Sequence, residues 1–187
     1  MPQIRTFIAV ELPEAIKREL ARLQSDLRRY GARVSWTRPE GLHVTLKFLG
    51  NVDERQIEAI AEAVKTAVAG EKQPRLTVVG TGAFPSWGSP RVLWVGVEDE
   101  KNRLAEIQAR LDKELEKLGF EREKRAFKPH LTLGRVKAIG GVRPVCEDLR
   151  NREVALGTFE VAEIVVMKSD LKPTGAVYTP LAKISID

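Results

Sequence analysis

Apolar residues recur along this chain with two periods, and each period predicts a different kind of element. Ile16, Leu20, Leu23 and Leu27 lie three or four positions apart, so they share one face of an amphipathic helix. The helix begins near Pro13, a residue suited to the first turn, and ends before Gly31. The same reasoning predicts helices over residues 54–69, 102–118 and 145–151.

Shorter apolar runs, bounded by Gly, Pro and polar residues, predict strands. These runs cover residues 4–12, 34–36, 42–49, 75–80, 91–97, 131–136, 154–156, 159–168 and 176–186. Groups of strands with helices between them favour an α+β fold in which the strands pair mainly antiparallel.

One tetrapeptide pattern, His-x-Thr-x, occurs twice and contains both histidines of the protein. The copies are His43-Val44-Thr45-Leu46 and His130-Leu131-Thr132-Leu133. On a strand, side chains at positions i and i+2 point to the same face. Each copy therefore presents one imidazole and one hydroxyl on one face, and it buries two aliphatic side chains on the other.

Two such strands side by side would form a polar pocket with two groups that exchange protons near neutral pH. One imidazole could activate a nucleophile while the other protonates a leaving oxygen, which suits phosphoryl chemistry. The alternative is that both histidines are structural residues within their strands. We favour the catalytic interpretation, because the only two histidines open the same tetrapeptide.

A weak internal repeat surrounds the two motifs. Each motif follows an amphipathic helix that ends in Gly, at Gly31 or Gly119, and an Arg lies five residues before each histidine, at Arg38 and Arg125. We therefore expect two pseudo-symmetric lobes of mainly antiparallel sheet, with helices on the outside and a central cleft that carries both motif strands. No linker separates the halves, so residues 1–187 are expected to form a single two-lobed domain.

Composition narrows the class of protein. The 187 residues are 43% hydrophobic and 30% charged, which is typical of a globular protein, and the net charge of +5 favours an anionic partner. The single cysteine, Cys146, excludes an internal disulfide and does not form a zinc-site pattern. No signal peptide and no apolar stretch near 18 residues is present, so we expect a cytoplasmic protein without a membrane span.

Three segments carry a resemblance to a known family: Phe7-Ile8-Ala9-Val10, Gly41-Leu42-His43-Val44-Thr45-Leu46-Lys47-Phe48-Leu49-Gly50 and Phe127-Lys128-Pro129-His130-Leu131-Thr132-Leu133-Gly134-Arg135. They resemble the LigT-like RNA 2′,3′-cyclic phosphodiesterases, or 2′-5′ RNA ligase family, of the two-histidine phosphoesterase superfamily. The similarity spans essentially the whole chain. One His-x-Thr-x is a weak signal, whereas two in these contexts are a strong one.

The resemblance implies hydrolysis of a terminal 2′,3′-cyclic phosphate on RNA to a 2′-phosphomonoester. By this analogy His130 is the proton acceptor that activates water, and His43 is the proton donor to the departing 3′ oxygen. Thr45 and Thr132 would donate hydrogen bonds to the non-bridging phosphate oxygens. Residue spacing alone does not assign the two histidine roles. The reverse reaction, 2′-5′ ligation, would exchange them.

Further substrate contacts are predicted with less support from the motifs. Arg135, five residues after His130, stands where the family has a cationic phosphate contact, and its planar guanidinium suits a phosphate. Lys47 has the strand parity of His43 and could point into the cleft, and Arg125 is a further candidate cation. Both could equally be solvated surface charges.

A terminal nucleotide also needs an aromatic surface on which its base can stack. Trp87 and Phe84 lie in a loop rich in Pro and Gly, so either is a candidate, although packing between the lobes explains either residue equally well or better. Phe48 has the opposite strand parity to His43 and is therefore predicted to lie in the core.

No cofactor and no metal is implied, because neither motif offers a carboxylate at ligand spacing. We expect a monomer whose partners are RNA ends or nucleotides bearing a 2′,3′-cyclic phosphate. The same residues would serve on another cyclic phosphate or on a short 2′-5′ oligonucleotide, and the sequence does not separate these substrates. A non-catalytic RNA- or nucleotide-binding module, or a basic scaffold without pocket chemistry, is the alternative of a different class.

Overall fold

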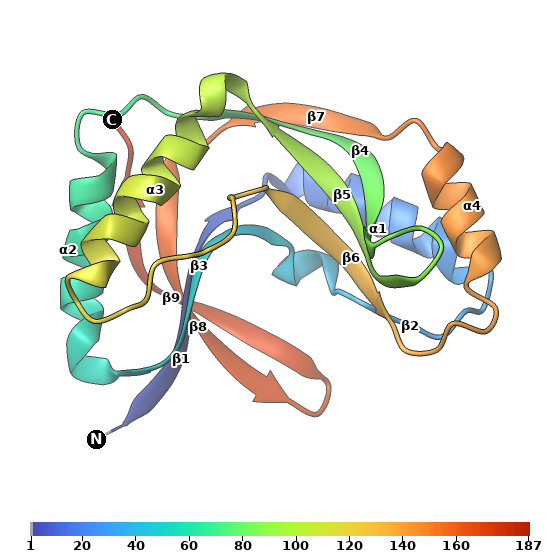
Figure 1. Ribbon diagram of the computed structural model, residues 1–187, viewed down its shortest axis with the longest axis horizontal. Helices are drawn as coiled ribbons and strands as arrows, with labels where there is room; N and C mark the ends of the chain where they lie inside the picture. Colours follow the sequence, from blue (N-terminus) through green and yellow to red (C-terminus); the bar gives the residue numbers. More distant parts are fainter. Residues whose placement is uncertain (1) are drawn as a thin grey trace.

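The computed structural model describes residues 2–187, whose strands form two antiparallel sheets (Figure 1). One sheet has the order β3-β1-β8-β9, and the other has the order β2-β6-β5-β4-β7. The strands are β1 (Gln3–Glu11), β2 (Val34–Trp36), β3 (His43–Asp53), β4 (Arg75–Pro85), β5 (Pro90–Asp99), β6 (His130–Val136), β7 (Ala155–Glu160), β8 (Glu163–Lys172) and β9 (Gly175–Ser185). The helices are α1 (Glu14–Arg28), α2 (Ile57–Val68), α3 (Arg103–Glu116) and α4 (Arg143–Asn151).

Helices pack against both sheets, which confirms the predicted α+β fold with two lobes. Helices α2 and α3 pack together, and α2 contacts the four-stranded sheet while α3 contacts β3 and β5, one strand of each sheet; α1 and α4 contact the five-stranded sheet. Figure 1 shows these two pairs towards opposite ends of the molecule. The four-stranded sheet contains β1 near the start of the chain and β9 near its end. Neither lobe is continuous in sequence, which explains why no linker was found.

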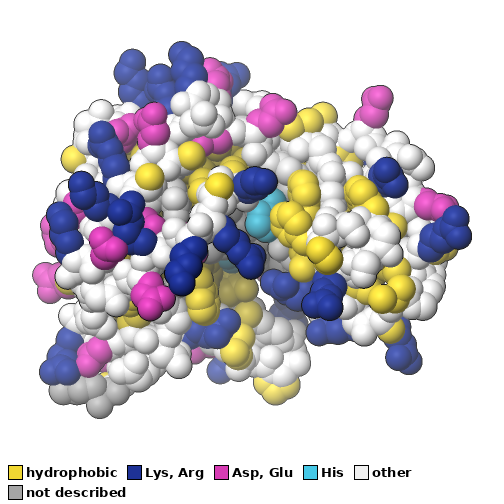
Figure 2. All heavy atoms as spheres, viewed as in Figure 1, with side chains coloured by type: hydrophobic (Ala, Val, Ile, Leu, Met, Phe, Trp, Pro, Cys, Tyr) yellow, Lys and Arg dark blue, Asp and Glu magenta, His cyan; other side chains and the backbone are white. Residues whose placement is uncertain are grey.

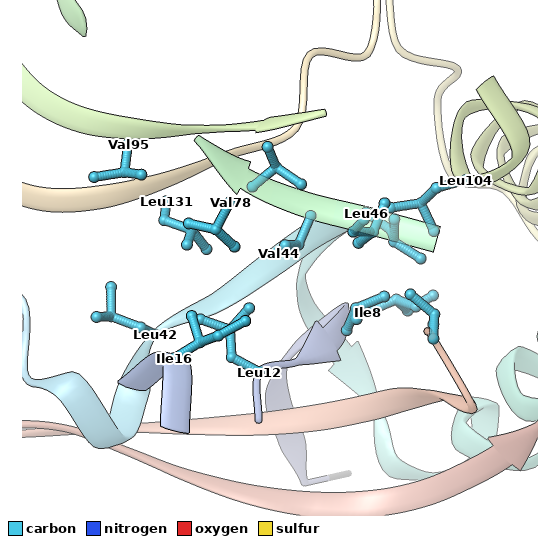
Figure 3. Close-up of a cluster of buried hydrophobic side chains, with 14 of the residues drawn as sticks. Ile8, Leu12, Ile16, Leu42, Val44, Leu46, Val78, Val95, Leu104 and Leu131 are labelled. Atoms are coloured by element: carbon cyan, nitrogen blue, oxygen red, sulfur yellow. The ribbon is translucent and has the colours of Figure 1, made fainter. Parts of the chain in front are cut away.

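The motif strands bury their aliphatic residues as strand alternation predicts. Val44 of β3 and Leu131 of β6, which directly follow the two histidines, are fully buried. Both belong to one hydrophobic cluster that also takes in Ile8 of β1 and Val95 of β5 (Figure 3). The cluster therefore draws on both sheets, and it anchors both motifs from behind.

Most predicted elements agree with the structure to within a few residues. The predicted strand over residues 159–168 is wrong in one respect, because β7 ends at Glu160 and β8 begins at Glu163. Strand β3 extends beyond the predicted residue 49 to Asp53. Among the described residues, no helix is both long and apolar enough to cross a membrane.

Candidate active site

Both motif strands contain a β-bulge directly after the motif threonine. In β3, Thr45 pairs with Ala9 and Lys47 pairs with Ile8, so Leu46 is the extra residue. The bulge in β6 is equivalent: Thr132 pairs with Trp94 and Gly134 pairs with Leu93, which leaves Leu133 as the extra residue. An extra residue reverses the alternation of faces beyond it. The residue five positions after each histidine therefore joins the face of that histidine.

The ring of His43 is enclosed by two aromatic side chains. Phe7 stacks on it at 4.7 Å between ring centres, and Tyr178 of β9 meets it edge-on at 5.1 Å. Burial lowers the pKa of His43 from 6.5 to about 4, and nearby Lys17 also lowers it, although a hydrogen bond with the backbone of Gly41 acts in the opposite direction. At neutral pH, His43 is therefore uncharged.

His130 has a related environment in the other lobe. Its Nδ1 lies 2.8 Å from the carbonyl oxygen of Lys128, and a carbonyl can only accept, so Nδ1 carries the hydrogen. In the neutral form of this ring, Nε2 carries the lone pair. Phe84 meets the ring edge-on at 5.2 Å, and Trp94 lies 6.2 Å away between ring centres. Each histidine thus bonds to the backbone two residues before it and contacts aromatic rings.

The two motif strands meet in the cleft between the sheets. Cα atoms of β3 and β6 approach to within 8 Å. Figure 2 shows histidine in a hollow at the centre of the visible face, with Lys and Arg side chains beside it. Thr45 is exposed and Thr132 is half-buried, each two residues from its histidine. The structure therefore brings the strands that carry the two motifs close together, and histidine lies in a basic hollow.

Lys47 does not face the cleft, so the prediction from strand parity is wrong. Its ammonium is buried and lies 2.6 Å from Oδ1 of Asp112 on α3 and 3.5 Å from Oε1 of Glu123, and it also donates to the carbonyl of Glu121. The bulge at Leu46 turns Lys47 to the opposite side of the sheet. Lys47 therefore links β3 to α3 and to the segment that leads towards β6.

The same bulge makes the prediction for Phe48 wrong. Phe48 is 48% exposed instead of buried, and the guanidinium carbon of Arg5 lies 4.7 Å from the centre of its ring. In β6 the corresponding residue is Arg135, which is exposed and pairs with Val92 on the face of Thr132. The structure thus places Arg135 beside the histidine motif, where strict alternation would have turned it away.

The remaining predicted substrate contacts lie in different surroundings. Trp87 is partly buried and packs against the hydrophobic core, whereas Phe84 is 39% exposed and touches His130. Arg125 is exposed and lines a hollow beside Phe48, in the segment before β6. Among the described residues, no three His, Cys, Asp or Glu side chains lie together as potential metal ligands.

Three aromatic residues of the site were not identified from the sequence. Phe7 and Tyr178 contact His43, and Trp94 contacts His130 and lies 5.1 Å from Phe84. Phe7 lies in a predicted strand, but its pairing with β3 was unknown. Tyr178 is more than 100 positions from His43, and no local pattern links the two.

Comparison with known proteins agrees with this geometry. Residues 10–94 and 95–178 each match the family described as LigT like Phosphoesterase. The chain belongs to the LigT-like phosphoesterase family. Each half of the chain matches the same family description, and each half contains one His-x-Thr motif, as the predicted repeat requires.

Individual LigT-like phosphoesterases resemble the chain along nearly its whole length. An RNA 2′,3′-cyclic phosphodiesterase of Methanothermobacter thermautotrophicus is 36% identical over 96% of this chain and 97% of its own. A protein of the same name from Thermotoga maritima is 38% identical over 95% of this chain and 93% of its own. The crystal structure of TT0787 from Thermus thermophilus superposes with a TM-score of 0.78 at 32% identity, and it covers 98% of each chain. LigT of E. coli, at 22% identity and a TM-score of 0.77 over 99% of each chain, shares the fold.

Proposed function

We propose that this protein is an RNA 2′,3′-cyclic phosphodiesterase that opens a terminal cyclic phosphate and leaves a 2′-phosphomonoester. The observation that carries the proposal is the close approach of the two His-x-Thr strands, together with histidine in a basic hollow. The relatives that bear this name cover almost the whole chain, which supports the same activity here.

His130 is the general base of the proposed reaction. Its Nδ1 hydrogen is directed to the carbonyl of Lys128, so Nε2 can accept a proton from water. The water oxygen forms a bond to phosphorus as its proton moves to His130, and the phosphorus–O3′ bond breaks. The phosphate remains on O2′.

His43 is the general acid, which gives its proton to O3′. Burial disfavours the charged ring and lowers its pKa to about 4. An anionic phosphate beside the ring offsets this penalty and raises the proton affinity of His43 when substrate binds. His43 therefore carries the proton that it donates only while substrate is bound.

Thr45, Thr132 and Arg135 stabilise the phosphate in this proposal. The two hydroxyls share the faces of the two histidines, and Arg135 is turned to the same side by the bulge in β6. Hydrogen bonds and positive charge at the non-bridging oxygens strengthen as negative charge develops in the transition state. Arg125, which lines a hollow beside Phe48, is a candidate contact for the RNA backbone.

Phe84 is the better of the two candidates for stacking a base. It is exposed and lies against His130, whereas Trp87 packs against the core. If this is correct, Phe84→Ala weakens substrate binding about tenfold, because one stacked base contributes roughly 1–3 kcal/mol. Trp87→Ala, the matched control, should lower stability and leave KM nearly unchanged.

We further propose that residues 1–187 act as one two-lobed domain, as a monomer and without a metal. The continuous cluster of buried residues from both sheets supports a single folding unit. The reaction as described uses only protons and hydrogen bonds, so it does not require a metal ion.

The test uses a short RNA that ends in a 2′,3′-cyclic phosphate, incubated with the protein in EDTA. Wild type is compared with His43→Ala and His130→Ala, and chromatography separates the 2′- and 3′-phosphate products. A 2′-phosphate formed by wild type and lost in both variants is the expected result. A 3′-phosphate would mean that O2′ leaves instead. No turnover, with binding retained in both variants, would favour a binding module.

A further inference from the structure

Two buried glutamines reach the two bulges of the active site. Gln24 on α1 is 2% exposed, and its Nε2 donates to the carbonyl of Leu133 at 2.9 Å. Gln108 on α3 is 7% exposed, and its Nε2 donates to the carbonyl of Leu46 at 3.3 Å. Leu133 and Leu46 are the extra residues of the two bulges. The same side-chain type thus contacts the same backbone atom in both lobes.

The sequence around the two glutamines is also equivalent. Each has a Leu four positions before it and a Leu three positions after it: Leu20 and Leu27 flank Gln24, and Leu104 and Leu111 flank Gln108. All four leucines are fully buried. Each glutamine therefore stands within the apolar stripe of its helix, where an aliphatic residue would serve packing alone.

A bulge creates a specific need for such a donor. The extra residue interrupts the regular ladder, so strand register alone does not fix its carbonyl. The N–H of Thr37 also reaches the carbonyl of Leu133 at 2.9 Å, so Gln24 is a second donor there. A hydrogen bond to such a buried carbonyl is worth roughly 0.5–1.5 kcal/mol. A glutamine amide supplies an N–H without bringing a charge into the core.

We propose that Gln24 and Gln108 are positioning residues that hold the two bulges and so direct the catalytic side chains into the cleft. Neither glutamine touches the hollow. Each acts through the residue next to a motif threonine, Leu133 after Thr132 and Leu46 after Thr45. The orientation of that threonine, and of the residue five positions after the histidine, depends on where the extra residue lies.

Each helix also makes a second contact to the chain beside its bulge. Gln24 also donates to the carbonyl of Thr37 at 2.6 Å, and the N–H of Thr37 donates to Leu133. On α3, Asp112 lies one turn after Gln108 and binds Lys47, the residue that follows Leu46. The bulges are therefore fixed relative to the helices and not only to the neighbouring strands.

The experiment compares Gln24→Met and Gln108→Met with Gln73→Met. Methionine keeps length and volume and removes the donor. Gln73 is the matched control, because its Nε2 donates to the carbonyl of Ile186 at 2.8 Å, outside the motif strands. We expect kcat to fall about 10- to 100-fold in the first two variants, since a displacement near 1 Å can cost about 100-fold. KM should change less than about threefold, and Gln73→Met should retain wild-type kcat.

A second measurement is independent of turnover. The protein has only two histidines, so its imidazole proton NMR spectrum has one set of signals per half-site. Gln24→Met should shift the signals of His130, and Gln108→Met those of His43, while Gln73→Met moves neither. The kinetic part of this inference rests on the proposed function. An inactive wild type would therefore refute that function, and the NMR comparison would still decide the positioning role.

Gln24→Glu and Gln108→Glu cover the case in which a methionine variant does not fold. A protonated Glu can donate to the carbonyl, and an ionised one cannot. The activity of each Glu variant, divided by that of wild type at the same pH, should rise as the pH falls. A ratio that does not change with pH, or folded Met variants with wild-type kcat and unshifted histidine signals, would overturn the proposal.

Discussion

The half-site of His43 and the half-site of His130 share a backbone design and differ in their surroundings. Both have the His-x-Thr strand, a bulge after the threonine and a hydrogen bond from the histidine to the backbone two residues earlier. In one half Phe7 stacks on the histidine ring and the bulge exposes Phe48. In the other half Phe84 meets the ring by its edge and the bulge exposes Arg135.

The neighbouring strands explain part of this difference. The position four residues after the histidine is Lys47 in β3 and Gly134 in β6. Strand β3 is at the edge of its sheet, where the side chain of Lys47 can reach Asp112. Strand β6 is flanked by β2 on one side and β5 on the other. A Cβ on Gly134 would lie only 2.6 Å from Val34, so that position has no room for a side chain. A repeated motif thus supplies two imidazoles in different surroundings, and burial lowers the pKa of His43.

The largest expected effect comes from a substrate with a better leaving group. A cyclic phosphorothiolate with sulfur at the 3′ position needs little protonation as its bond breaks. We expect His43→Ala, which lacks the acid, to regain about 10³-fold of its lost activity on this substrate, within the range that general acid catalysis supplies. His130→Ala should remain inactive. Rescue of His130→Ala instead would exchange the two roles.

The buried ion pair of the His43 half is expected to affect stability and not the chemistry. Lys47→Met removes one partner and leaves Asp112 buried without its cation, which costs about 3–5 kcal/mol of unfolding free energy. Denaturant unfolding measures this loss. The double variant Lys47→Met, Asp112→Leu should recover most of it. If Lys47→Met were as stable as wild type but bound phosphate weakly, the interpretation of Lys47 as a cleft residue would be correct instead.

Arg135 and Phe48 occupy equivalent positions in the two half-sites. Their variants should therefore show which half-site contributes the contact to phosphate. Arg135→Met removes a charged contact to phosphate, and we expect kcat/KM to fall about 10- to 100-fold, as for loss of a charge-assisted hydrogen bond. Phe48→Met should lower kcat/KM much less. Steady-state kinetics on the same cyclic-phosphate RNA tests both. Equal losses would mean that Phe48 also contacts the substrate.

Tyr178→Ala should have the smallest effect, confined to the proton affinity of His43. Removing the ring that meets its edge lets water reach the imidazole, so the pKa of His43 should rise from about 4 by roughly 1–2 units. NMR titration of the two histidines measures it. In wild type the folded pKa lies below the unfolded value of about 6.5, so stability falls as the pH drops from about 6.5 to about 4. The variant should lose less stability over that window, and an unchanged pKa would contradict this account.

Local pattern was sufficient for much of this molecule. The two His-x-Thr motifs, the helices with their apolar stripes and most strand positions follow from periodicity, because alternation and helical spacing depend on neighbours within a few residues. The burial of Val44 and Leu131 behind the motifs follows from the same rule. The α+β class with two lobes also follows, because the motif and the helix before it are repeated along the chain.

Only the tertiary structure decided which way the side chains after each motif threonine point and which residues surround each histidine ring. A bulge depends on the register with a partner strand, which strand alternation does not contain, and it reversed the orientations expected for Lys47 and Phe48. The pKa of His43 depends on water being excluded by Phe7 and Tyr178, which come from strands at opposite ends of the chain. The sequence by itself determined which groups can do the chemistry, and folding decided which of them face the cleft and how readily His43 holds a proton.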